Sequence, residues 1–322
     1  IADILESEYD MTPDRKAIRR SLLDLMNCGY QIEYSEAVRM TPNPKTGQPE
    51  ESYIWSDFYL EREFADSELR LLIDGLLFSR HIPYSQCKEL VEKLEGLSNI
   101  YFRARVRHIA KMPEDRTDNK QLFLNIELLD EAISRRRKVS FHYLEYGTDK
   151  QMHRKTRPDG SVREYVISPY QMAAREGKYY LICNYDTYDD ISNYRVDRIA
   201  DIKILDEPAK PFGKLKWANS RMLDLAEYMK EHPYMYSSGT VRVKFRIVRA
   251  MISDVIDVFG SGVRFSDEDE EGVTVSTTTN ELAAEQFAKS FAPDVVVLEP
   301  KRLREKVEDN LRKSLSAYEH FS

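Results

Sequence analysis

Aromatic and basic side chains alternate along residues 168–204, and no acid–base or metal-binding cluster accompanies them. The segment predicts three short strands, over residues 170–175, 179–185 and 191–198, with Glu176-Gly177 as the first turn. Because alternate residues of a strand share a face, arginine and tyrosine side chains can gather on one surface of a small β-barrel. Such a surface suits an anionic, stackable ligand, namely a nucleotide or single-stranded nucleic acid.

The same segment resembles a known family. The runs 177–181 (GKYYL) and 194–199 (YRVDRI) resemble the core of a WYL domain, which is named for a Trp-Tyr-Leu tripeptide. Tyr179 stands where the family has Trp, and the runs 168–170 (SPY) and 139–143 (VSFHY) also fit the pattern. The resemblance implies an Sm/SH3-like barrel that senses a ligand inside bacterial transcription regulators.

By this resemblance, Arg195 becomes the first candidate for ligand contact. The other candidates are polar or aromatic residues of the same strands: Ser140, His142, Tyr143, Tyr170, Arg175, Tyr180 and Arg198. The tyrosines have an alternative role in core and rim packing, and Arg198 has one as a salt-bridge partner of Asp201 or Asp197. Arg195 and Arg198 fall on opposite faces if their strand is regular, unless it ends between them.

Four cations at the amino end, within residues 15–20, predict contact with DNA phosphates. Thr12-Pro13-Asp14 indicates a helix start with Thr12 as cap, and apolar residues at helical spacing extend the helix to about residue 28. Strands over 30–40 and 52–59 follow, joined by a turn at 42–47, so we expect the second half of a winged helix-turn-helix. The alternative is a solvated helix face. The expected DNA contacts are Thr12, Arg15, Lys16, Arg19, Arg20 and Lys45.

The chain divides into five expected regions. Residues 1–60 form the DNA-binding domain, and 61–137 form a helical segment with predicted helices at 67–79, 84–95 and 121–137. The first two of these helices have apolar faces and are the candidate surface for a homodimer. Residues 138–206 form the WYL barrel, and 207–239 form a linker and a helix.

The last region, residues 240–322, shows the element order βαββαβα. This order predicts a compact α+β domain of ferredoxin-like character, and the region resembles the C-terminal extension that follows many WYL domains. The expected fold class is therefore multidomain α+β, with a winged helix-turn-helix, an Sm/SH3-like barrel and a ferredoxin-like domain.

Composition narrows the classes of function. The chain has 322 residues, a formal net charge of −7 and three widely spaced cysteines, which favours a reducing cytoplasm over a disulfide or zinc framework. The six histidines form no HExxH motif, and Phe259-Gly260-Ser261-Gly262 is too short for a phosphate loop. We expect no catalytic residues, no metal, no cofactor and no membrane span. The first residue is Ile1, so we expect some N-terminal sequence to be missing.

The predicted function is a cytoplasmic, ligand-responsive, DNA-binding transcription regulator, homodimeric, whose WYL domain senses a nucleotide or single-stranded nucleic acid. The alternative from a different class is an accessory factor of an antiviral, CRISPR-type system that binds RNA or single-stranded DNA. A hydrolase would require a cluster of acids in a cleft.

Overall fold

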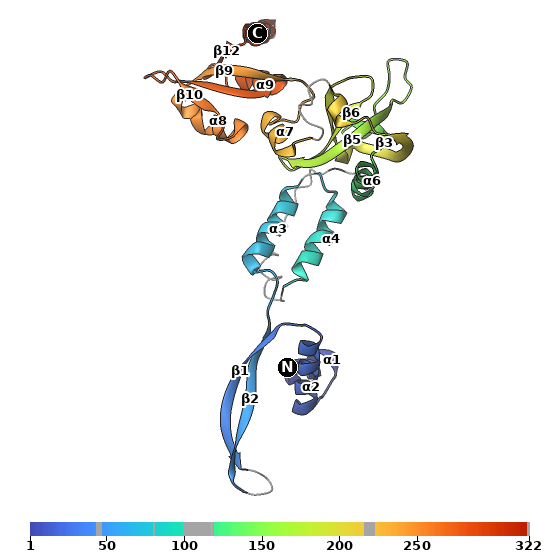
Figure 1. Cartoon of the computed structure of the whole chain (residues 1–322), viewed down its shortest axis with the longest axis vertical. Coiled ribbons are helices and arrows are strands. Elements are labelled where there is room, and N and C mark those ends of the chain that lie inside the picture. Colours follow the sequence, from blue (N-terminus) through green and yellow to red (C-terminus); the bar gives the residue numbers. More distant parts are fainter. Residues whose placement is uncertain (43–46, 80, 99–116, 118, 216–222, 321–322) are drawn as a thin grey trace. The chain divides into compact units, whose positions relative to one another are not determined.

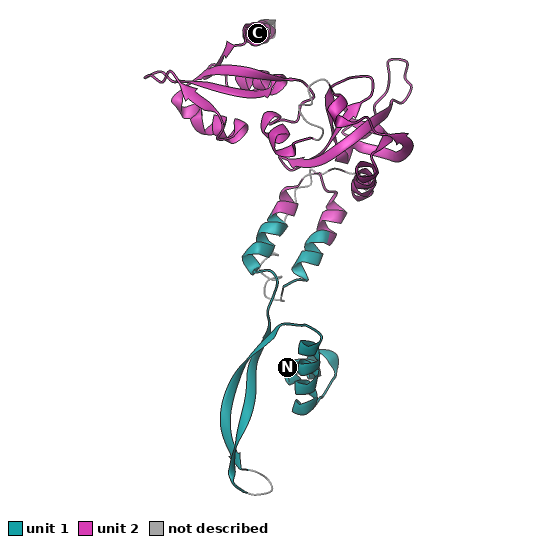
Figure 2. Cartoon of the chain, viewed as in Figure 1, with its two compact units in different colours: residues 1–74, 90–110 teal, residues 75–89, 111–322 magenta. Residues whose placement is uncertain are grey.

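The computed structural model describes residues 1–42, 47–79, 81–98, 117, 119–215 and 223–320. The chain forms two compact units. One comprises Ile1–Asp74 and Leu90–Ala110, and the other comprises Gly75–Glu89 and Lys111–Ser322 (Figure 2). The structure is mixed α/β, and the strand pairs within its sheets are antiparallel. No helix of the described ranges combines the length and apolar character needed to cross a membrane.

The amino-terminal unit begins with two helices and a long hairpin (Figure 1). These are α1 (Ala2–Tyr9), α2 (Arg15–Asn27), β1 (Ile32–Pro42) and β2 (Pro49–Leu60). The expectation that Thr12 caps the helix is wrong: Asp14 is the N-cap, and its carboxylate accepts from the Ala17 N–H at 2.6 Å. Asp14 takes this position because it lies three residues before Ala17, as a capping side chain must.

Two helices follow the hairpin, α3 (Asp66–Phe78) and α4 (Tyr84–Glu95), and the boundary between the two units passes through both. Leu69, Ile73 and Leu77 recur at helical spacing on α3 and are buried, whereas Leu72 on the expected apolar face is exposed. Dimerisation through these helices stays a prediction.

The second unit contains a six-stranded sheet. Helix α6 (Leu122–Arg135) precedes β3 (Arg137–Tyr146), and the chain continues through β4 (Met152–Arg154), β5 (Glu164–Arg175), β6 (Lys178–Tyr185), β7 (Ile191–Arg195), η1 (Val196–Arg198) and β8 (Ile199–Pro208). The strand order is β4-β3-β5-β6-β7, with β8 paired to β3. The described strands do not close into a barrel, because the chain leaves β7 through the η1 turn and β7 has no ladder to β8.

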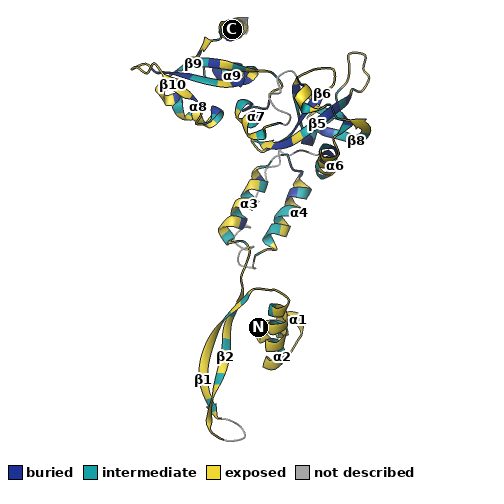
Figure 3. Cartoon of the chain, viewed as in Figure 1, coloured by how far each residue is buried: buried dark blue, intermediate teal, exposed yellow. Residues whose placement is uncertain are grey.

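Alternating apolar residues make the interior of this sheet. Val139, Phe141, Ile167, Leu181 and Ile199 are almost completely buried. Figure 3 shows buried stretches of β5 and β6 in dark blue. Glu176 and Gly177, at φ 49° and 67°, form the tight turn between β5 and β6 that the sequence predicts.

A short helix, α7 (Leu225–Glu231), packs against the same sheet after η2 (Phe212–Lys214). Its Tyr228 and the following Met235 share a buried cluster with Ala173, Ile182 and Ile191 of the sheet. This packing anchors the segment that leads into the C-terminal domain.

The C-terminal domain has the predicted element order. It comprises β9 (Thr240–Ile247), η3 (Arg249–Met251), α8 (Ile252–Phe259), β10 (Arg264–Ser266), β11 (Val273–Asn280), α9 (Glu281–Ser290), β12 (Val295–Glu299) and α10 (Lys301–His320). The sheet order is β10-β11-β9-β12, and Phe245, Phe259 and Phe287 form the centre of its core. Gly272 permits close strand packing, since a Cβ there would lie 2.1 Å from the Ile247 carbonyl oxygen.

Candidate functional site

A cluster of aromatic rings lies on the six-stranded sheet, and we call it the tyrosine cluster. Tyr194 of β7 is central to it, with ring centroids 5.4 Å from Phe141, 5.1 Å from Tyr143 and 5.4 Å from Tyr165, all edge to face. Burial raises the pKa of Tyr143 and of Tyr194, so both hydroxyls stay protonated at neutral pH. Phe141 and Tyr165 are buried and Tyr143 and Tyr194 are half-buried, so the tyrosine cluster is packed mainly against itself and its hydroxyl groups are neutral.

Arg163 lies over this cluster, although the sequence analysis did not select it. Its guanidinium carbon is 4.7 Å from the Tyr165 ring centroid and 5.8 Å from that of Tyr185. The sequence signal for Arg163 is that Tyr165 follows two positions later, which repeats the basic–aromatic pattern of the later strands. The Arg163 guanidinium thus places a positive charge over the ring faces, and this charge can attract an anionic ligand.

Arg195, the first candidate for ligand contact, is paired within the protein. Its Nε donates to Asp197 Oδ1 at 3.0 Å and its Nη2 to Asp197 Oδ2 at 2.6 Å. The Asp197 side chain is 2% exposed. The Arg195 backbone N–H also donates to the Tyr143 hydroxyl at 3.2 Å. A ligand that uses Arg195 would have to compete with this buried carboxylate, and ligand contact by Arg195 stays a prediction.

Arg198, three residues later, has a different environment. Strand β7 ends at Arg195, and Arg198 is the last residue of the η1 turn. The strand thus ends between the two arginines, which is one of the two alternatives that the sequence left open. The Arg198 guanidinium lies 5.7 Å from the Tyr146 ring centroid, and its buried Nε has no hydrogen-bond partner within the described chain. A buried N–H without a partner costs about 1–3 kcal/mol, so an incoming acceptor would be stabilised there.

The salt-bridge alternatives for Arg198 are not formed, because other groups occupy both acids. Asp197 pairs with Arg195, and Asp201 lies 3.0 Å from His142 Nδ1 and 2.6 Å from Arg154 Nη2. Hydrogen bonds from His142 and Arg154 outweigh desolvation and hold the pKa of Asp201 below its ordinary value.

The remaining candidates are largely engaged by the protein itself. The Tyr170 hydroxyl donates to the Lys210 carbonyl at 2.9 Å, and Arg175 Nε donates to the Pro233 carbonyl at 3.0 Å. Ser140 is 4% exposed, and Tyr180 packs at the edge of the buried cluster that contains Tyr228. The structure thus brings Tyr143 close to Arg195 and Tyr194, and Tyr180 is the cross-strand partner of Arg195. Tyr170 and Arg175 belong to the packing around α7.

Two buried asparagines hold the η1 turn from the side of α6. Asn119 Nδ2 donates to the carbonyls of Asp197 and Ile199 at 2.9 and 2.8 Å. Asn125 Nδ2 donates to the Ile199 carbonyl at 2.7 Å and to that of Val196 at 3.4 Å. The turn that carries Arg198 is therefore fixed to the helix that precedes the sheet.

In the amino-terminal unit, the predicted cations of α2 are exposed. Positions 15, 16, 19 and 20 cover one broad face of a helix. The Arg19 guanidinium lies 4.1 Å from the centroid of the Trp55 ring, and Trp55 Nε1 donates to Glu36 Oε1 at 2.8 Å. Thr12 is exposed before the helix, and Lys45 lies outside the described residues. A helix with a basic face thus contacts the hairpin that follows it.

Comparison with known proteins identifies two domains. The family model of the WYL domain matches residues 125–204, and that of the WCX domain matches residues 239–315. No curated protein matches the chain.

Two solved structures are similar at low identity. Proteasome accessory factor B/C (PafBC) of Arthrobacter aurescens is 15% identical, with 98% of this chain and 46% of that chain covered and a TM-score of 0.30. A CRISPR Cas-related protein is 13% identical, with 99% and 76% covered and a TM-score of 0.40. The chain thus spans less than half of the first of these proteins, and similarity at this level supports no inference about function.

Proposed function

Since this chain is a WYL-domain protein with a C-terminal WCX domain, we propose that it is a ligand-responsive, DNA-binding transcription regulator. In this proposal α1, α2 and the β1–β2 hairpin act as a winged helix-turn-helix, and the WYL sheet is an open Sm/SH3-like barrel. The C-terminal domain is ferredoxin-like, which its sheet order β10-β11-β9-β12 supports. The effector is a nucleotide or single-stranded nucleic acid, and the proposal assigns no catalytic residue or cofactor.

The observation that carries the sensing role is Arg198. Its guanidinium has no carboxylate partner among the described residues, and its buried Nε lacks an acceptor. A phosphate group can supply both the negative charge and the acceptor. The exposed Tyr146 ring, 5.7 Å from the Arg198 guanidinium, can contact a base, since aromatic rings stack on bases with little sequence preference.

The exposed basic face of α2 supports the DNA-binding role. Phosphate contacts require cations that converge on one face, and Arg15, Lys16 and Arg20 meet this requirement with no acidic partner among the described residues. Arg19 packs on Trp55, so it also fixes the helix against the hairpin.

Contacts between the α3–α4 connection and the WYL sheet support coupling. His81 Nδ1 lies 2.6 Å from the Gly177 carbonyl oxygen, and the His81 ring stacks on Tyr179 at 6.1 Å. Tyr179 occupies the first position of the Trp-Tyr-Leu tripeptide for which the WYL domain is named. In a homodimer, movement here would change the spacing of two DNA-binding units, to which half-site binding is sensitive.

A gel-shift experiment tests the proposal. The full chain is titrated against duplex DNA from its own promoter and against single-stranded oligonucleotides of matched length, with and without added effector. We expect duplex binding that the single strand modulates. Binding of single-stranded RNA or DNA with no affinity for the duplex would reject the regulator and favour the accessory-factor alternative.

A further inference from the structure

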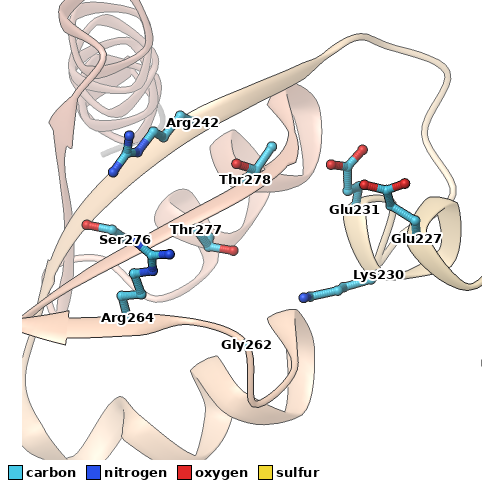
Figure 4. A pocket seen from close by; sticks show the side chains of 9 residues that line it. All are labelled: Glu227, Lys230, Glu231, Arg242, Gly262, Arg264, Ser276, Thr277 and Thr278. Atoms are coloured by element: carbon cyan, nitrogen blue, oxygen red, sulfur yellow. The ribbon is translucent and has the colours of Figure 1, made fainter. Parts of the chain in front are cut away.

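The C-terminal domain and α7 line an open cavity of about 330 Å3 (Figure 4). Its lining includes neither Arg198 nor any residue of the tyrosine cluster. Strands β9, β10 and β11 line one side, and α7 contributes the other. This volume is within the range of small-ligand pockets and exceeds that of an inorganic anion.

Two arginines and two hydroxyls share one face of the sheet in this cavity. Arg264 of β10 pairs in register with Ser276 of β11, and Arg242 of β9 pairs with Thr278. Cross-strand partners lie on the same face, and residues 276 and 278 lie two apart on one strand, so all four side chains lie on the same face. That face is opposite the core, because Val243 and Val275, the sequence neighbours of Arg242 and Ser276, are fully buried.

These arginines differ from the other cations on the same strand. Lys244 of β9 pairs with Glu299 at 2.9 Å, and Arg246 pairs with Asp269. Arg242 and Arg264 have no carboxylate partner anywhere in the described chain, and their cross-strand neighbours are hydroxyl residues. Unpaired guanidinium groups beside hydroxyl donors form a typical environment for a phosphate group.

Helix α7 adds a third cation and two acids. Lys230 extends to Gly262, where a Cβ would lie only 2.6 Å from its Nζ. Glu227 and Glu231 lie on the same helix and line the cavity. Burial and the neighbouring Glu227 raise the pKa of Glu231. The lining is thus basic on the sheet and carries hydrogen-bond acceptors on the helix.

We propose that this cavity binds an organic phosphate monoester whose remaining part carries hydroxyl or amino groups. Arg242, Arg264, Ser276 and Thr278 hold the phosphate, Lys230 contacts it from α7, and the two glutamates accept hydrogen bonds from the organic part. This is a second ligand site, and it does not depend on the effector site at Arg198.

Binding here would fix α7 to the C-terminal domain. One contact between them already exists, since Thr279 Oγ1 donates to the Glu231 carbonyl at 3.1 Å. Tyr228 of α7 packs in the cluster with Ile182 and Ile191 of the WYL sheet. A phosphate held by both sides would therefore join the WYL and WCX domains through α7.

Calorimetric titration of the full chain tests this site with ribose 5-phosphate, adenosine monophosphate, inorganic phosphate and ribose. We expect saturable binding of at least one phosphate monoester, weaker binding of inorganic phosphate and none of ribose. Preference between the two esters tells a sugar phosphate from a nucleotide. Arg242→Gln and Arg264→Gln should each weaken binding by about tenfold or more, because each removes charge-assisted hydrogen bonds.

Arg246→Gln is the matched control. Arg246 lies on the same face of β9 as Arg242, but it already has a carboxylate partner in Asp269. Thr278→Val removes one hydroxyl without a charge change and should also weaken binding. Absence of monoester binding, or equal affinity in the wild type and in Arg242→Gln/Arg264→Gln, would overturn the proposal. The double variant should still shift promoter DNA, which separates this test from the test of the regulator.

Discussion

Arg195 and Asp197 form a bidentate ion pair across the start of the η1 turn, with N–O distances of 3.0 and 2.6 Å. The carboxylate is 2% exposed and the guanidinium side chain 22% exposed. A pair in this position fixes the turn, and removal of the arginine alone leaves an uncompensated buried charge.

Arg195→Ala should therefore lower the free energy of unfolding by about 3 kcal/mol, the low end for a buried pair because part of Arg195 is exposed. Urea unfolding followed by circular dichroism measures this change. Arg195→Ala/Asp197→Ala should be less destabilised than the sum of both single variants. Additive losses would show that the pair does not stabilise the turn.

Arg198→Gln should abolish the response to the effector and leave the fold intact, because Arg198 has an unsatisfied Nε and no acidic partner in the described ranges. Fluorescence anisotropy with a labelled single-stranded oligonucleotide measures the affinity for the effector, which should fall at least about tenfold. Arg135→Gln is the control, since it removes an exposed arginine of the same domain that pairs with Glu131. Equal affinity of the two variants would remove Arg198 from the site.

Arg15→Ala/Arg20→Ala should weaken promoter binding and reduce the slope of log K against log salt by about two, one for each lost phosphate contact. Both side chains are exposed on α2. A salt titration of the gel shift checks this. Arg70→Ala, in which the lost arginine pairs with Asp74 on α3, should leave the slope unchanged. An unaltered slope in the double variant would reject DNA contact by α2.

Glu285 predicts a pH-dependent stability of the C-terminal domain. Burial alone would raise its pKa, but ion pairs with Lys289 and Lys306, both at 2.8 Å, outweigh burial and lower it. A lowered folded-state pKa gives stability above the unfolded pKa of about 4.3 and loses it as pH falls through the folded value.

Glu285→Gln should consequently melt below the wild type at pH 7 by several degrees, and the difference should shrink as pH falls below about 4. Differential scanning calorimetry at pH 7, 5 and 3 measures the gap. Glu281→Gln is the control, because Glu281, at the start of the same helix, pairs with the exposed Arg302. A gap independent of pH would show that the charge of Glu285 does not contribute.

The sequence predicts the C-terminal domain well because its elements are local. Alternation along β9 and β11 and the helical spacing of α9 each depend on residues within a few positions of one another. Strands β3, β5, β6 and β7 are predicted for the same reason, whereas β4 and β8 are not, and β7 ends at Arg195 instead of Arg198. Local patterns also place the turn at Glu176-Gly177, where positive φ values are required.

The sequence predicts the site less well because its chemistry depends on long-range pairing. The Arg195–Asp197 pair requires the strand to end at residue 195, and Arg198 loses both expected partners to Arg195, His142 and Arg154. Arg163 joins the tyrosine cluster only because β5 lies beside β3 and β6. The cavity at Arg242 and Arg264 depends on three strands and a helix meeting, which no local pattern records.

Asn119 and Asn125 give the η1 turn a mechanical consequence. The amide groups of Asn119, which precedes α6, and Asn125 of α6 donate to the carbonyls of Val196, Asp197 and Ile199, and these bonds are buried. Buried hydrogen bonds of this kind are costly to break, so the η1 turn and the start of α6 should move together. A ligand that binds Arg198 and shifts the η1 turn would therefore also shift Asn119 and Asn125, which lie where the chain enters the WYL domain.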